Sequence, residues 1–236
     1  TVTENSVQAV KTARDAYNAL EELHKNFVEN YSKLVNAETT LSALEVYKAT
    51  GNYLEKLIKD NAPTVNTTGG EWLVLGLARS GKTVPIQYYA NVINYVNENI
   101  DEEGQLHWFK STDNSRVIIG LTSAGYDATN VAGNDLTKAL KDIDYVKQQG
   151  VNGLIWALIA TDSHSNVNLG RADRKALVDE ILEQQLEDGG WTVMEGGTTT
   201  ETDITAMAVQ ALAPYYSTDA KVKAAVEKAL DKLSAM

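Results

Sequence analysis

The stretch GVNGLIWALIATDSH, residues 150–164, decides the fold of this chain. Its centre, from Leu154 to Ala160, is an uninterrupted apolar run, far shorter than the roughly 18 residues needed to span a bilayer. A helix that is apolar on nearly every side is buried by neighbours all round, because a surface helix keeps one polar face. We therefore expect an inner helix enclosed by other helices, and no insertion into a membrane.

Three other apolar segments can be aligned with this one on a central small residue. The four segments are LVLG ending at Gly76, VIIG ending at Gly120, LIWA ending at Ala157 and TAMA ending at Ala208. Each is followed by a more polar, amphipathic stretch, at 87–99, 136–148, 174–187 and 221–233 respectively. This alternation predicts a repeated pair of one buried and one outer helix, with a helix at 47–59 as the outer member of an additional, partial pair.

Residues 1–60 have a different composition from the rest of the chain. They contain a single glycine, Gly51, and neither proline nor tryptophan, whereas the remainder holds every other glycine and all the prolines and tryptophans. Apolar residues recur from Val7 to Leu44 at three- and four-residue steps, the spacing of amphipathic helices that bury one face in a core. The sequence therefore predicts two domains, a small antiparallel helical bundle at 1–47 and a repeat domain at 48–236.

The repeat segments resemble a known superfamily. GGEWLVLGLARSGKTVP (69–85), SRVIIGLTSAGYDATNVAG (115–133), GVNGLIWALIATDSH (150–164) and QLEDGGWTVMEGGTTTETDITAMAVQALAPYY (185–216) are similar to repeats of the prenyltransferase and squalene-cyclase superfamily. Within it, they are most similar to a Gram-positive cell-surface branch that is related in fold to the cobalamin-binding protein transcobalamin. The segment ARDAYNALEELHKNFVENYSKLVNAE (13–38) resembles the helical spacer units of large Gram-positive surface proteins.

This resemblance implies an all-α fold, an α/α toroid that is partial or open, with helix hairpins in concentric layers. The run from Gln185 through Gly189 to Trp191 fits the core of the superfamily's QW motif. It implies that Trp191 packs against the neighbouring repeat and that Gln185 bonds to adjacent backbone. The resemblance also implies an extracellular location, at the cell surface or cell wall, within a longer multidomain chain.

The charge and the lack of cysteine exclude several kinds of partner. Twenty-one basic residues against 32 acidic ones leave a net charge of -11. Such a field repels nucleic-acid phosphates and anionic lipid surfaces, so we expect neither as a partner. Without cysteine there is no disulfide and no thiolate ligand. We expect no metal and no cofactor.

Polar residues stand at the same offset before each central small residue. They are Glu71, Ser115, Asn152 and Asp203. Such residues are favoured at helix starts simply because they cap exposed N–H groups, so capping alone could explain them. If the four buried helices run parallel, however, their starts converge and form a polar ring over an apolar cup, the kind of concave site that binds small ligands. The candidate ligand-binding residues are Glu71, Trp72, Ser115, Arg116, Asn152, Trp156 and Asp203.

The residues needed for the superfamily's enzyme chemistry are missing. The resemblance would require a DxDD motif for alkene protonation, an aspartate-rich cluster for diphosphate, or an Asp/Cys/His zinc site, and the sequence contains none of them. Asp203 is the candidate acid if the chain is an enzyme, but it lacks the paired carboxylate that tunes such an acid. Other toroids cleave polyuronates with Arg, Tyr and His, for which Arg116, Tyr126, His107 and His164 are the candidates.

Three hypotheses for function stay open at this point. The favoured one is a non-catalytic cell-surface module whose toroid cup binds a small molecule, peptide or glycan. The first alternative is an enzyme, either a divergent terpene cyclase or a polyuronate-lyase-like protein. The second alternative is a structural spacer of a surface adhesin.

Overall fold

The computed structural model describes residues 1–67, 69–163, 171–193 and 196–236. Within these ranges the regular structure is helical, apart from a single β-bridge between Val131 and Asn134. The predicted all-α class is therefore confirmed. None of the described helices is both long enough and apolar enough to cross a membrane.

The chain divides into two compact units. The first comprises Thr1–Asn61 and Arg79–Lys82, and the second comprises Ala62–Ala78 and Thr83–Met236. Residue 47, where the sequence suggested a boundary, lies inside the long helix α3 (Tyr31–Leu57). No proline or capping motif interrupts this helix, so the helix expected at 47–59 is its second half rather than a separate element.

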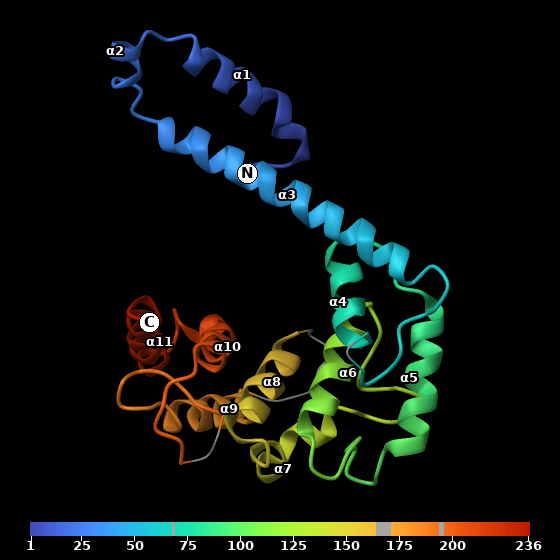
Figure 1. Cartoon of the computed structure of the whole chain (residues 1–236). Coiled ribbons are helices and arrows are strands. Elements are labelled where there is room, and N and C mark those ends of the chain that lie inside the picture. The colour runs from blue at the N-terminus through green and yellow to red at the C-terminus, as the bar shows by residue number, and fades with distance from the viewer. Residues whose placement is uncertain (68, 164–170, 194–195) are drawn as a thin grey trace. The chain divides into compact units, whose positions relative to one another are not determined.

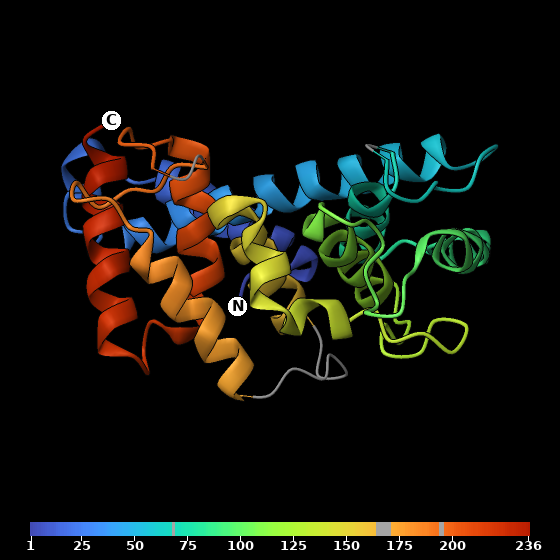
Figure 2. The ribbon, with the colours of Figure 1, turned by 90° about the horizontal axis from the view of Figure 1, so that it is seen from below.

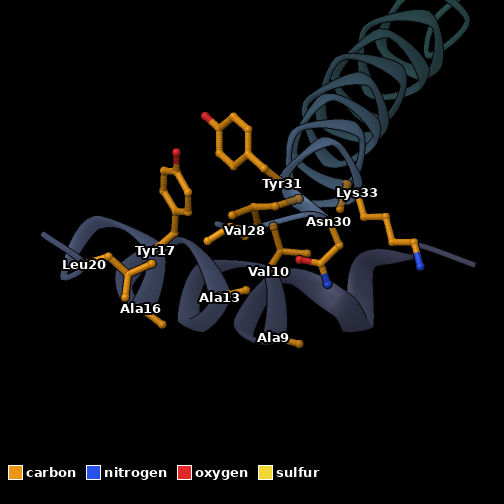
Figure 3. A pocket seen from close by; sticks show the side chains of 12 residues that line it. Ala9, Val10, Ala13, Ala16, Tyr17, Leu20, Val28, Asn30, Tyr31 and Lys33 are labelled. Carbon is orange, nitrogen blue, oxygen red and sulfur yellow. The ribbon is translucent and has the colours of Figure 1, made fainter. Parts of the chain in front are cut away.

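The first unit is a helical hairpin. A short 3₁₀ turn, η1 (Glu4–Ser6), leads into α1 (Val7–Asn18), and the single-turn helix α2 (Glu22–Lys25) precedes α3. Arg14 on α1 donates two hydrogen bonds to the Glu38 carboxylate on α3, at 2.6 and 2.5 Å. The rings of Tyr17 and Tyr31 stack with centroids 4.3 Å apart, and Figure 3 shows them standing side by side.

This hairpin has almost no buried core. Gly51 is the only buried residue within residues 1–61, all of which the structure describes. The apolar stripe expected to form a core instead lines a groove of about 560 Å³ between α1 and α3 (Figure 3). Leu23 and Phe27, at the turn, are 76% and 80% exposed. Two helices alone cannot enclose their facing apolar sides, because burial on all sides takes further layers.

The second unit carries the predicted repeats. Its elements are α4 (Glu71–Arg79), α5 (Ile86–Asn99), α6 (Ser111–Ser123), η2 (Lys138–Lys141), α7 (Ile143–Lys147), α8 (Gly150–Asp162), α9 (Arg171–Glu183), α10 (Thr202–Leu212), η3 (Ala213–Tyr215) and α11 (Ala220–Ser234). The four aligned apolar segments lie on α4, α6, α8 and α10, as predicted. Three of the outer helices also match.

The remaining outer helix, expected at 136–148, is split into η2 and α7. Asp142 stands between them and accepts hydrogen bonds from the backbone N–H groups of Asp144 and Tyr145, both at 3.1 Å. Because such a side chain replaces the preceding turn as the partner of these N–H groups, it begins a new helix rather than continuing an old one. The predicted long helix is therefore wrong in this one repeat.

The apolar helix α8 is the centre of the second unit. It packs against α6, α7, α9 and α10, while α11 packs against α9 and α10. Both views show α8 between α6 and the pair formed by α10 and α11 (Figures 1 and 2). Gly153 lets α8 approach α7 closely, since a Cβ at this position would clash with the carbonyl oxygen of Val146 on α7. The inner helices thus lie next to one another in chain order.

The QW segment is the join between the last two repeats. Trp191 is fully buried, and its indole N–H donates to the Ile181 carbonyl at 2.7 Å. Gln185 donates from Nε2 to the carbonyl oxygens of Gly189 and Ala225, at 2.8 and 2.9 Å. The Trp191 backbone N–H donates to Thr205 Oγ1 on α10 at 2.9 Å. The predicted packing of Trp191 and the predicted backbone bonding of Gln185 are confirmed.

Replacing Trp191 with Ala should lower the free energy of unfolding by about 3–5 kcal/mol, because it empties a large enclosed volume and leaves the Ile181 carbonyl unpaired. Denaturant unfolding followed by circular dichroism measures this. Trp108→Ala is the matched control: that side chain is 77% exposed, and its loss should change stability by no more than about 0.5 kcal/mol. Equal effects of the two substitutions would contradict the packing described here.

Gly120, in the middle of α6, faces the Tyr88 hydroxyl from α5, which has no hydrogen-bond partner in the described part of the chain. Gly120→Ala should therefore destabilise by about 1–3 kcal/mol through a clash with that oxygen. Tyr88→Phe should be nearly neutral alone, since it removes an unpaired hydroxyl. Added to Gly120→Ala it should recover part of the lost stability, because it removes the nearest clashing atom, while Glu71 Cγ stays 3.2 Å from the position of the alanine Cβ. Simple additivity in the double-mutant cycle would rule out the contact.

Candidate functional site

A pocket of about 480 Å³ lies in the second unit, where the N-terminal ends of three inner helices meet. The segment before α4 contributes Asn66 and Thr67, and α4 itself contributes Trp72. Lys110, Thr112, Asp113 and Arg116 come from the start of α6, and Asn152 and Trp156 come from α8. The predicted convergence of helix starts is therefore observed for α4, α6 and α8.

Four of the seven predicted binding residues line this pocket: Trp72, Arg116, Asn152 and Trp156. Glu71 and Ser115 are fully buried and do not line it. Asp203 is exposed on the first turn of α10 and lies outside the pocket lining. The helix starts thus gather three of the four polar positions into one region, but only Asn152 of those four reaches the pocket.

The two tryptophans form one wall of the pocket. The ring centroids of Trp72 and Trp156 lie 5.0 Å apart, with the planes tilted by 52°. Each side chain stands on the early turns of its helix, and each is half-buried. A partly exposed aromatic pair beside polar groups can stack against a sugar face or a flat ring while the polar groups orient it.

A hydrogen-bonded network holds the polar side of the pocket. Arg116 Nη2 donates to Asp113 Oδ1 at 2.7 Å and also to Asn66 Oδ1. Asn66 Nδ2 donates to Asp113 Oδ2 at 2.8 Å and to the Tyr95 hydroxyl at 2.7 Å. Asn66 has a φ of 55°, a left-handed conformation that asparagine tolerates better than most residues. This residue therefore ties the segment before α4 to α5 and α6.

Glu71 lies behind this network. Its Oε1 accepts a hydrogen bond from the Asn66 backbone N–H at 2.7 Å, while its Oε2 is buried with no partner in the described part of the chain. Burial raises the pKa of Glu71 above the ordinary carboxyl value, although the bond from Asn66 opposes this shift. Burial also raises the pKa of Tyr88, whose hydroxyl is similarly unpaired. Both side chains face Gly120, and neither lines the pocket.

Gln149 links the starts of α6 and α8. Its Oε1 accepts a hydrogen bond at 2.9 Å from the backbone N–H of Thr112, which lies on the first turn of α6. Gln149 itself stands immediately before α8. Ser115 Oγ donates to the Ser111 carbonyl at 3.4 Å within α6. Ser115 thus bonds within its own helix. It lies one turn inside α6, which begins at Ser111, so its predicted place at the helix start is wrong.

The residues considered for polyuronate cleavage are not gathered in one place. His107 Nδ1 accepts hydrogen bonds from the backbone N–H groups of Phe109 and Lys110, at 3.0 and 3.1 Å, which occupies it in its own loop. Tyr126 stacks on Tyr89 with centroids 4.2 Å apart. Only Arg116 of this set lines the pocket, and His164 lies outside the described residues.

Sequence reasoning missed five lining residues: Asn66, Thr67, Lys110, Thr112 and Asp113. Asp113 had a usable signal, since it stands three residues before Arg116 on one face of a helix, where opposite charges pair. Asn66 had no such signal. Its role comes from a left-handed backbone turn that brings it back over the helix starts, and no local pattern encodes that return.

The described residues contain no group of three or more His, Cys, Asp or Glu side chains placed to hold a metal ion. Comparisons of the chain with protein-family models, with curated proteins and with solved structures returned no match. Function is therefore inferred from the geometry of this pocket and from the resemblance seen in the sequence.

The raised pKa of Glu71 predicts a pH dependence of stability. The folded chain keeps this proton at pH values where the unfolded chain, with a carboxyl pKa of about 4.3, has released it. The free energy of unfolding should therefore fall as the pH rises from about 4.3 through the higher folded value. Glu71→Gln keeps the acceptor for Asn66 but cannot ionise, so it should remove this fall.

Urea unfolding at a series of pH values from 4 to 8 measures the effect. Glu98→Gln, at an exposed position on α5, is the control and should leave the profile unchanged. If Glu71→Gln and the unaltered chain lose stability in parallel as the pH rises, Glu71 is ionised throughout and the prediction fails.

Proposed function

We propose that the second unit is a non-catalytic binding module and that the pocket at the starts of α4, α6 and α8 takes a small molecule, a glycan or a peptide end. The observation that carries this proposal is the convergence, in one pocket of about 480 Å³, of a tryptophan pair with hydrogen-bonded polar side chains. Pockets of about 300–1,000 Å³ with a few convergent polar groups are the usual form of small-ligand sites.

The module is proposed to be an open α/α toroid. In support, the inner helices α6, α8 and α10 pack in chain order, and α9 and α11 follow their inner partners as outer helices. Glu71 of α4 faces Gly120 of α6, which adds the first inner helix to the same row. The toroid and the placement at a Gram-positive cell surface, within a longer chain, rest on the resemblance of the repeat segments.

The carboxylates near the pocket favour binding over acid catalysis. Asp113 is the carboxylate among the lining residues, and both of its oxygens accept hydrogen bonds, from Arg116 and from Asn66. Because both oxygens are already engaged as acceptors, Asp113 is held by the network rather than free to act on a ligand. Asp203, the candidate acid of an enzyme, is exposed and is not among the pocket-lining residues.

Titrating a panel of sugars, short peptides and metabolites while following tryptophan fluorescence tests the proposal. At least one class should saturate the signal in a Trp108→Phe background, which removes the exposed tryptophan. Trp156→Ala should weaken that binding at least tenfold, about 1.4 kcal/mol, because it removes half of the stacking wall. Asp203→Asn is the matched control and should bind as before.

If no member of the panel changes the tryptophan fluorescence, the result counts against binding and in favour of the spacer alternative. Unchanged affinity of the Trp156→Ala variant would also count against binding in this pocket. Product formation from isoprenoids or uronate polymers under the same conditions would favour the enzyme alternative instead. Each result therefore selects one of the three hypotheses.

A further inference from the structure

The cationic groups of the pocket are more available to a ligand than its carboxylate. Asp113 has a side chain only 2% exposed, and both of its oxygens are occupied by Arg116 and Asn66. The Arg116 side chain is 24% exposed. Lys110 is exposed at the N-cap position of α6.

Arg116 presents only part of its guanidinium to the pocket. Nη2 is bonded to Asp113 and Asn66, and Nε is buried without a partner among the described residues. Neither Nη1 of Arg116 nor Nζ of Lys110 has a hydrogen-bond partner in that part of the chain, and both residues line the pocket. The network thus orients Arg116 while leaving one of its amino groups for a ligand, as a preorganised recognition site requires.

This local charge is opposite to that of the chain as a whole, which carries a net charge of -11. The early turns of α4, α6 and α8 add positive partial charge from their backbone N–H groups. The described pocket lining nevertheless includes just two cationic side chains, Lys110 and Arg116, and the Asp113 carboxylate lies next to them. A single negative charge is therefore favoured over a multiply charged phosphate, which the surrounding acidic field would repel.

We propose that the pocket binds a small monoanion, a carboxylate attached to a ring, with the carboxylate held by Arg116 and Lys110 and the ring placed against Trp72 and Trp156. This proposal rests on the proposed binding function and names its ligand class. Arg116 Nη1 and Lys110 Nζ supply two donor groups, which match the two oxygens of one carboxylate. The tryptophan pair supplies the flat surface on which a sugar or aromatic ring lies.

The first test needs no ligand. In the Trp108→Phe background, iodide should quench the fluorescence of the pocket tryptophans more than caesium does, with neutral acrylamide as the reference for access. Lys110→Gln should reduce the iodide quenching, whereas Lys141→Gln, at an exposed position of η2 outside the pocket, should not. Equal quenching by iodide and caesium would overturn the proposal without bearing on whether the pocket binds neutral ligands.

The second test uses matched pairs of probes that differ only in charge. Methyl glucuronide is compared with methyl glucoside, and phenylacetate with 2-phenylethanol, while methyl phosphate serves as the phosphate arm. One carboxylate should bind at least tenfold more tightly than its neutral partner, and its affinity should fall with added salt. Lys110→Gln should weaken that binding about three- to tenfold, and Lys141→Gln should not change it.

The outcomes separate the two proposals. Equal affinity within a pair overturns the monoanion proposal and leaves the binding function standing. Tighter binding of methyl phosphate than of either carboxylate overturns the choice of carboxylate. If neither carboxylate saturates the signal, the monoanion proposal fails, and the binding function then depends on whether a neutral member of the wider panel binds.

Discussion

The second unit depends on the complete burial of α8. This helix has no polar face, so it is stable only when α6, α7, α9 and α10 surround it. Close approach on one side needs Gly153, whose missing side chain admits the Val146 carbonyl. Since α8 contacts the inner helices on both sides of it, its position sets where their first turns lie. The pocket is a consequence of that packing, because its lining residues stand on the first two turns of these helices or before them.

Much of this arrangement could be predicted from the apolar segments alone. A helix that is apolar all round can only be an inner helix, and four such segments followed by amphipathic stretches determine the helical class and the alternation. The split of the second outer stretch, 136–148, at Asp142 was not predicted, because the same residue is compatible with a helix interior and with a helix start. The long α3 was not predicted either, since the sequence was divided into two domains at residue 47, which lies inside this helix.

The site was predicted in part, and there is a physical reason why some lining residues were found and others were missed. Trp72, Arg116, Asn152 and Trp156 are found by counting along helices, since each lies a fixed distance from its helix start. Asn66 and Lys110 lie before a helix begins, where position depends on the path of the preceding segment. Glu71 was predicted at the right helix turn but faces the interior, because the offset that locates a helix start does not set which side of the helix a residue occupies. Ser115 was predicted at a helix start, but α6 already begins at Ser111, so Ser115 lies one turn inside the helix and is buried.

The hydrogen bond from the Thr112 backbone to Gln149 has a consequence for how the repeats vary. This bond fixes the first turns of α6 and α8 relative to each other directly, whatever the length of the chain between them. The intervals between successive inner segments can therefore differ from one repeat to the next while the openings of these helices stay aligned. Insertions or deletions in the segment between α6 and α8 should therefore leave the relative position of their first turns unchanged.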